Sequence, residues 1–124
     1  MKKLTASEEQ VMQILWDMEK AFVKDIIERF PIPNPPYNTI SSVVRILEKK
    51  GFVSHKVYGH THEYFPIISR DMYKKFYLKD ALKNYFEGSF QQMVSFFAKE
   101  EEVDVEELQQ LIDMIKKHES DKNG

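Results

Sequence analysis

The chain has 124 residues, of which 42% are hydrophobic and 31% charged, and its formal net charge is −2. This length and balance fit one globular domain with an appendage, and they exclude a disordered chain and a two-domain enzyme with a cleft between its domains. Because the chain has no cysteine, disulfide bonds, thiolate metal ligands and thiol catalysis are excluded as well.

Two helix patterns open the chain. Thr5 and Glu8 have the spacing of a capping box, and apolar residues at helical spacing follow as far as Met18, which predicts a first helix. A second pattern covers residues 22–30. The proline-rich segment 31–36 ends it, because proline lacks the backbone donor that a continuing helix needs.

A third helix and a hairpin are predicted next. The helix begins near Asn38 and ends at Lys50, because Gly51 can take the left-handed conformation that closes a helix. Residues 52–66 are rich in β-branched and aromatic side chains on both sides of Gly59, which indicates a β-hairpin. Three helices followed by a hairpin is the element order of a winged helix.

The second half of the chain has only helix patterns. They cover residues 70–87, residues 89–99 and a last stretch that opens with a capping box at residues 104–107. We therefore predict a mainly α protein with a small β-hairpin, in which a winged helix-turn-helix domain at residues 1–69 is followed by a helical dimerisation domain at residues 70–124.

A local basic patch points to nucleic acid. Residues 37–62 contain four basic residues and one acidic residue, although the whole chain is slightly acidic. Short polar side chains let a helix lie deep in the major groove, arginine can bind guanine with two hydrogen bonds, and a hairpin can contact the phosphates alongside. The predicted DNA contacts are Asn38, Thr39, Ser41, Ser42, Arg45 and Lys49 on the third helix, and Lys56, His60 and His62 on the hairpin.

The hairpin histidines His55, His60 and His62 raise the alternative of a metal site. Zinc usually takes three or four ligands with ordered supporting groups, but the chain offers no cysteine and only Glu63 as a nearby carboxylate. We therefore predict histidines that face solvent or phosphate, with no metal and no other cofactor. Phosphate loops and catalytic triads are also absent from the sequence, so we predict that the protein is not an enzyme.

The C-terminal half carries more large apolar residues than isolated helices can bury. Exposed patches of this kind usually mark an interface, and a second copy of the chain is the simplest partner. Packing of these helices onto the winged helix remains the alternative. The predicted dimerisation residues are Phe76, Leu82, Phe86, Phe90, Val94, Phe97, Leu108, Leu111, Ile112 and Ile115.

Neither a signal sequence nor a membrane span is predicted. The two lysines near the start are not followed by an apolar core, and no apolar run approaches membrane-spanning length. We expect a cytoplasmic protein that does not insert into a membrane.

Three stretches resemble a known family of regulators. They are similar to the penicillinase repressor family, which includes the methicillin-resistance and copper-responsive repressors, and they are Leu4-Thr5 with Glu8 to Ile14-Leu15-Trp16, residues 37–53 from Tyr37-Asn38-Thr39-Ile40 to Lys50-Gly51-Phe52-Val53, and the hairpin end Tyr64-Phe65-Pro66. The similarity extends from Leu4 to about Lys117. It implies a homodimer on a palindromic double-stranded DNA operator, with recognition-helix contacts at Asn38, Thr39, Ser41, Ser42 and Arg45.

The resemblance also implies how repression ends. Members of the family are cleaved in the dimerisation region under the control of a membrane-bound sensor protease, between Asn and Phe before Ala-Lys. The matching residues here are Phe96 and Phe97, so phenylalanine replaces the expected asparagine. The C-terminal cysteine hook of the copper-responsive branch is missing, which excludes copper sensing by that route. The proline-rich segment 31–36 also departs from the family pattern.

These observations predict a sequence-specific transcriptional repressor that is released from DNA by a signal at its C-terminal domain. The alternative is a protein–protein adaptor in which the winged helix no longer touches DNA and the aromatic helices hold a different protein. A gel-shift experiment discriminates between them, because only the repressor retards a duplex.

Overall fold

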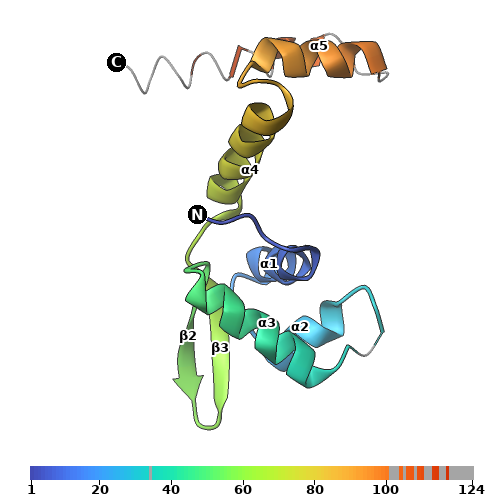
Figure 1. The fold of residues 1–124 in the computed structure, drawn as a ribbon. Coiled ribbons are helices and arrows are strands. Elements are labelled where there is room, and N and C mark those ends of the chain that lie inside the picture. Colours follow the sequence, from blue (N-terminus) through green and yellow to red (C-terminus); the bar gives the residue numbers. More distant parts are fainter. Residues whose placement is uncertain are drawn as a thin grey trace. The chain divides into compact units, whose positions relative to one another are not determined.

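The computed structural model describes residues 1–33 and 35–100, with positions 104, 106, 107, 109, 110, 113, 114 and 117 beyond them (Figure 1). The chain divides into two compact units, Met1–Tyr77 and Leu78–Gly124. The element order is α1 (Ala6–Met18), β1 (Ala21–Phe22), α2 (Val23–Arg29), α3 (Tyr37–Lys49), β2 (Val53–Tyr58), β3 (Thr61–Pro66), α4 (Arg70–Tyr85) and α5 (Phe90–Glu100). The prediction of a mainly helical chain with a winged helix is confirmed.

The start of α1 has the predicted capping box. Thr5 Oγ1 accepts from the backbone N–H of Glu8 at 3.3 Å, and Glu8 Oε1 accepts from the backbone N–H of Thr5 at 2.9 Å. The helix ends at Met18, and Glu19 takes a positive φ of 71° directly afterwards. At the helix start, the capping box thus gives partners to two backbone N–H groups that a helix otherwise leaves unsatisfied.

The second helix begins one residue later than predicted, because Phe22 belongs to a short strand. Its backbone N–H donates to Asp25 Oδ2 at 3.1 Å, which caps α2. Strand β1 pairs antiparallel with β3, with Ala21 opposite Tyr64 and Phe22 opposite Glu63. The sheet order β1-β3-β2 therefore adds a third strand to the hairpin that the sequence predicts.

The end of α3 is closed by Gly51, as predicted. Gly51 has a φ of 83°, and its N–H donates to the Glu48 carbonyl at 3.0 Å. The N–H of Phe52 donates to the Leu47 carbonyl at 2.9 Å, which completes a Schellman motif. Phe52 is fully buried, so the motif turns the chain directly into the core before β2 begins.

The hairpin β2–β3 has a two-residue turn. Tyr58 pairs with Thr61, which leaves Gly59 and His60 as the turn residues. Gly59 has a φ of 62°, as the first position of a type II′ turn requires. At the base of the hairpin one face of the two strands packs on the core, where Val53 and Tyr64 are buried. Toward the turn both strands become exposed.

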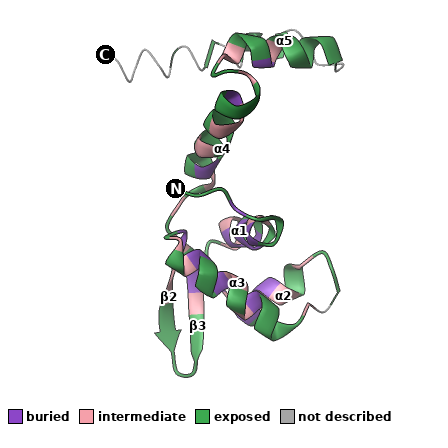
Figure 2. Ribbon diagram, in the orientation of Figure 1, coloured by how far each residue is buried: buried purple, intermediate pink, exposed green. Residues whose placement is uncertain are grey.

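The core of the first unit lies between α1, α2, α3 and the base of the sheet. Figure 2 shows buried residues along the helices and exposed residues around the turn of the hairpin. The largest fully buried side chains are Phe52, Met12, Leu15, Ile26, Ile40, Leu47, Val11, Val44 and Val53. The first turns of α4 belong to this unit too, because Tyr73 and Phe76 pack against the same core.

The second unit contains the rest of α4 and helix α5. Gly88, with a φ of 79°, lies between them. The predicted last helix falls largely outside the described residues, and the domain boundary after residue 69 stays a prediction. Among the residues that the structure describes, no helix combines the length and apolar character needed to cross a bilayer.

Candidate nucleic-acid interface

Helix α3 presents a polar strip to solvent because its opposite face is locked in the core. Ile40, Val44 and Leu47 are buried, with exposures of 2% or less. The predicted contact residues Asn38, Ser42, Arg45 and Lys49 are all exposed. Their spacing of four, three and four residues places them in one line along the helix, directly opposite the buried residues. This line is called the α3 strip below.

Two further predicted residues flank the α3 strip. Thr39 is exposed on one side, and Ser41 is half-buried on the other. Arg45 Nε donates to the Ser41 carbonyl at 3.2 Å, so one guanidinium donor is directed back along the helix. The structure therefore brings all six predicted helix residues onto the same broad face, with Ser41 at its margin.

Two apolar residues of this face were missed by the sequence analysis. Tyr37 is 57% exposed at the start of α3, and Ile46 is 45% exposed about two turns after Thr39 on the same side of the helix. The helical spacing contains the signal for Ile46, because it lies four residues after Ser42 and one after Arg45. Apolar side chains on such a face suit the methyl group of thymine in the major groove.

The C-terminal end of α3 is fixed by an ion pair that the sequence analysis did not find. Lys50 Nζ lies 2.7 and 2.8 Å from the two carboxylate oxygens of Glu8, which is only 4% exposed. Burial alone would raise the pKa of Glu8, but the hydrogen bonds from Lys50 and Thr5, with the charge of Lys50, outweigh it and lower the pKa below 4.5. Lys50 thus belongs to the scaffold, and its charge is compensated there.

The hairpin has two chemically different faces, because side chains alternate along its strands. On one face Lys56 lies over the Tyr58 ring at 5.3 Å, and Tyr58 makes an edge contact with Phe22 of β1 at 5.8 Å. Lys56, a predicted contact, is exposed there. His60 is exposed in the turn, so it is held at the tip and away from the other two hairpin histidines in the strands.

The other face carries His55 and His62. Their rings are stacked, with 4.2 Å between centroids and 10° between planes. His55 Nδ1 hydrogen-bonds Glu48 Oε1 of α3, and burial together with the charge of Glu48 raises the pKa of the neighbouring Tyr64. Rings stacked face to face do not direct their lone pairs at one ion. Nowhere in the described part of the chain do three His, Asp or Glu side chains gather as ligands for a metal.

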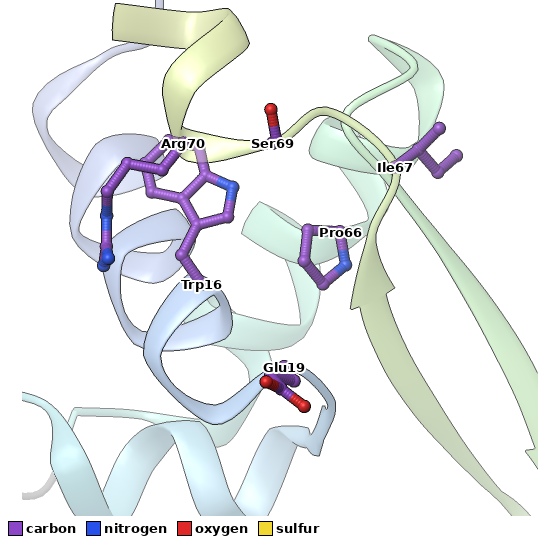
Figure 3. A pocket seen from close by; sticks show the side chains of 6 residues that line it. All are labelled: Trp16, Glu19, Pro66, Ile67, Ser69 and Arg70. Carbon is purple, nitrogen blue, oxygen red and sulfur yellow. The ribbon is translucent and has the colours of Figure 1, made fainter.

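A shallow hollow lies where α1, β3 and α4 meet (Figure 3). The Trp16 indole Nε1 donates to the Ile68 carbonyl at 2.8 Å, and Arg70 lies over the Trp16 ring at 5.6 Å while pairing with Asp17 at 2.6 Å. The Trp16 indole and the Arg70 guanidinium thus already have partners within the chain. These contacts attach the start of α4 to α1.

The predicted dimerisation residues occupy varied environments. Phe76 is half-buried against the core of the first unit, and Leu82 is buried in the second. Phe86, Phe90 and Val94 are half-buried, whereas Phe97 is 41% exposed. The remaining four, Leu108, Leu111, Ile112 and Ile115, lie outside the described residues. The assignment of these ten residues to a dimer interface stays a prediction.

The element order and the sheet define a winged-helix fold, and its third helix carries the exposed α3 strip. A family model described as penicillinase repressor matches residues 4–117. The chain therefore belongs to the penicillinase repressor family, a family of transcriptional repressors.

Individual relatives are distant but match over nearly their full lengths. The methicillin resistance regulatory protein MecI of Staphylococcus aureus is 24% identical over 116 residues, which cover 93% of this chain and 94% of that protein. The penicillinase repressor of Bacillus licheniformis is 24% identical over 121 residues, with coverages of 97% and 94%. The solution structure of the DNA-binding domain of the repressor BlaI is similar with a TM-score of 0.51 and 26% identity, covering 59% of this chain and 94% of that one.

Proposed function

We propose that the protein is a sequence-specific DNA-binding repressor that acts as a homodimer on a palindromic operator. The α3 strip enters the major groove, and the hairpin contacts the phosphates beside it. The observation that carries this proposal is the alignment of Asn38, Ser42, Arg45 and Lys49 along one exposed line of a helix whose other face is locked in the core. Membership of a family of repressors supports it.

Each part of this surface suits a different part of a duplex. Asn38 and Arg45 carry the amide and guanidinium groups that pair with adenine and guanine edges, and the small side chain of Ser42 allows close approach. Lys49 and Lys56 are exposed cations suited to phosphate. Affinity should therefore fall steeply with salt concentration, because bound cations release counterions from the DNA.

The apolar surface of the second unit supports a homodimer. Leu78, Tyr85, Phe96 and Phe97 are between 41% and 74% exposed, and Leu82 and Met93 are the buried apolar side chains of its described part. A second copy of the same helices would cover this surface. Twofold symmetry then predicts half-sites separated by about one helical turn of DNA, or a multiple of it.

Replacing Arg45 with alanine is expected to weaken operator binding by about 1–3 kcal/mol and to relax the choice of base at one position of each half-site. The operator is a duplex selected by the wild-type protein from a random pool, and binding is measured by gel shift at fixed salt. Lys79→Ala, which removes one positive charge from the second unit, is the control. Equal affinities for wild type and Arg45→Ala would contradict a place for Arg45 in the DNA contact.

The dimer itself is tested by replacing Phe97 with aspartate. A carboxylate in the centre of an apolar interface loses its hydration, so we expect the variant to be a monomer at concentrations where the wild type is a dimer. Sedimentation velocity measures the mass, and Lys99→Asp on the same helix is the matched control. If the wild type is a monomer at tens of micromolar, or if Phe97→Asp remains dimeric, the proposed interface is wrong.

Release by proteolysis is part of the same proposal. Phe96 and Phe97 lie on α5 at the position where the family is cleaved, and in the proposed dimer a protease would reach them only when the interface opens. Cleavage requires local unwinding of the helix, because proteases act on opened segments. A membrane-bound sensor protease would be the partner that cuts the chain.

The proposed function as a whole is tested by the same selection of duplexes. If the wild-type protein selects no duplex from the pool, the repressor hypothesis is wrong and the adaptor is the remaining interpretation.

A further inference from the structure

Three side chains join α3 to the hairpin, and together they are called the Glu48–His55–His62 stack. His55 connects Glu48, through its Nδ1, with His62, on which its ring is stacked. We propose that this stack makes operator binding proton-linked, with His55 as a positioning residue that carries a positive charge between recognition helix and hairpin in the DNA complex. The proposal rests on the proposed function, because it concerns the same surface.

The stack lies at the edge of the α3 strip, and water reaches it. The side chains of Glu48 and His55 are 32% and 28% exposed, and His62 is exposed. Glu48 follows Arg45 by three residues, so it borders the strip on the side of the hairpin. A phosphate held between the strip and the hairpin would therefore lie close to the Glu48 carboxylate.

The charged and titratable groups around His55 come from two neighbouring elements. From β3, His62 and Tyr64 lie against its ring, with 4.2 and 5.5 Å between their ring centroids and that of His55. From α3, Glu48 bonds it, and the charges of Glu48, Arg45 and Tyr37 all act on the adjacent Tyr64. On its own strand, Lys56 points to the opposite face of the sheet. Glu48 is the acidic member of this set, and it is bonded directly to His55.

The net charge of the Glu48–His55–His62 stack depends on whether His55 carries a proton. With His55 neutral, the Glu48 carboxylate leaves a negative charge beside the path of the DNA backbone and repels phosphate. Protonation of His55 cancels that charge while keeping the bond to Glu48, so the hairpin stays in place against α3. Phosphate in turn favours the charged imidazole. DNA binding should therefore take up a proton, and affinity should rise as pH falls from 8 to 6.

The test uses the full-length protein and the duplex that it selects from a random pool. Binding is measured by fluorescence anisotropy at pH 6, 7 and 8 and constant ionic strength. The wild type is expected to bind about 3- to 10-fold more tightly at pH 6 than at pH 8, which lies within the limit of about a hundredfold that one linked proton sets over two pH units.

Two variants separate the charge from the geometry. Glu48→Gln keeps an oxygen that accepts from His55 but removes the negative charge, and His55→Asn keeps a donor toward Glu48 but does not titrate. Each is expected to bring the ratio between pH 6 and pH 8 below the wild-type value, and the dependence that remains belongs to His60 and His62, the exposed hairpin histidines among the predicted DNA contacts. Glu63→Gln is the matched control. It removes the same charge from the opposite face of the hairpin, and the wild-type pH ratio should persist.

A second measurement needs no variant of the stack. NMR titration of the His55 ring, without and with the duplex, should show its titration midpoint at higher pH in the complex. An unshifted midpoint, or a wild-type pH ratio in both Glu48→Gln and His55→Asn, overturns the proton linkage while leaving the repressor intact. Failure of the wild type to select any duplex overturns the proposed function and this proposal with it.

Discussion

Replacing Phe52 with alanine is expected to lower the free energy of unfolding of the first unit by about 3–5 kcal/mol, which is the usual cost of removing a buried phenylalanine ring. The side chain is fully buried. Its removal takes away apolar burial and leaves a cavity that the surrounding helices fill only in part.

Phe52 connects the end of α3, the end of the hairpin and the start of α4. Its N–H donates to the Leu47 carbonyl, and its carbonyl accepts from the backbone N–H groups of Ile67 at 2.8 Å and Ile68 at 3.3 Å. Its ring makes an edge contact with Tyr73 of α4, 5.8 Å between centroids. Loss of the ring therefore weakens the packing of α3 as well as that of the core.

The measurement is urea unfolding followed by circular dichroism, with Phe65→Ala as the matched control. Phe65 is the same residue type on β3, but it is 38% exposed, so its loss should cost less than about 1 kcal/mol. Equal losses for the two variants would show that the region around Phe52 is not the core of the cooperative unit.

Replacing Glu8 with glutamine is expected to cost about 1.5–3 kcal/mol near neutral pH, which is the range for hydrogen bonds to charged groups. Glutamine keeps the bond to the Thr5 backbone but leaves Lys50 beside a neutral amide in a mostly buried position. The loss is expected mainly at the end of α3, whose last turn loses its charged anchor, because the capping bonds of α1 remain.

The pH dependence of this effect has a definite sign. The pKa of Glu8 is lower in the folded chain than its ordinary value of 4.5. The ionised carboxylate therefore stabilises the fold fully above pH 4.5, and this stabilisation is lost as the pH falls through the depressed folded value. Wild type should lose stability over that interval, and the difference between wild type and Glu8→Gln should shrink there.

Urea unfolding at pH 7, 5, 4 and 3 checks both the size and the sign. Glu9→Gln, in the same first turn, is the control and should change stability little. A double-mutant cycle with Lys50→Met isolates the coupling between Glu8 and Lys50. Additive effects in that cycle, or a wild-type advantage that is unchanged at pH 3, would contradict the role given to the ion pair.

The features that the sequence predicts well are those governed by short spacings. The Thr5–Glu8 capping box, the helix end at Gly51 and the turn at Gly59 each depend on residues within a few positions, and all three are present. The exposed line on α3 follows from helical periodicity in the same way, because the burial of Ile40 and Leu47 determines which side chains face outward.

The features that the sequence does not predict depend on tertiary placement. Strand β1 has two residues, too few for a pattern, and it is a strand because β3 lies beside it. The pair of Glu8 and Lys50 joins residues 42 positions apart. The bond between Glu48 and His55 needs the register of the hairpin against α3, which neither segment specifies alone.

The attachment of the first turns of α4 has a consequence for how a cut repressor would behave. Tyr73 Oη accepts from the Leu4 backbone N–H at 3.0 Å, and the Trp16 and Arg70 contacts hold the same turn, all upstream of α5. Cleavage between residues 96 and 97 would therefore leave the winged-helix unit of each chain intact. If the protein binds its operator as the proposed dimer, the two winged-helix units would then lose their high effective concentration at neighbouring half-sites, and each would have to bind from dilute solution.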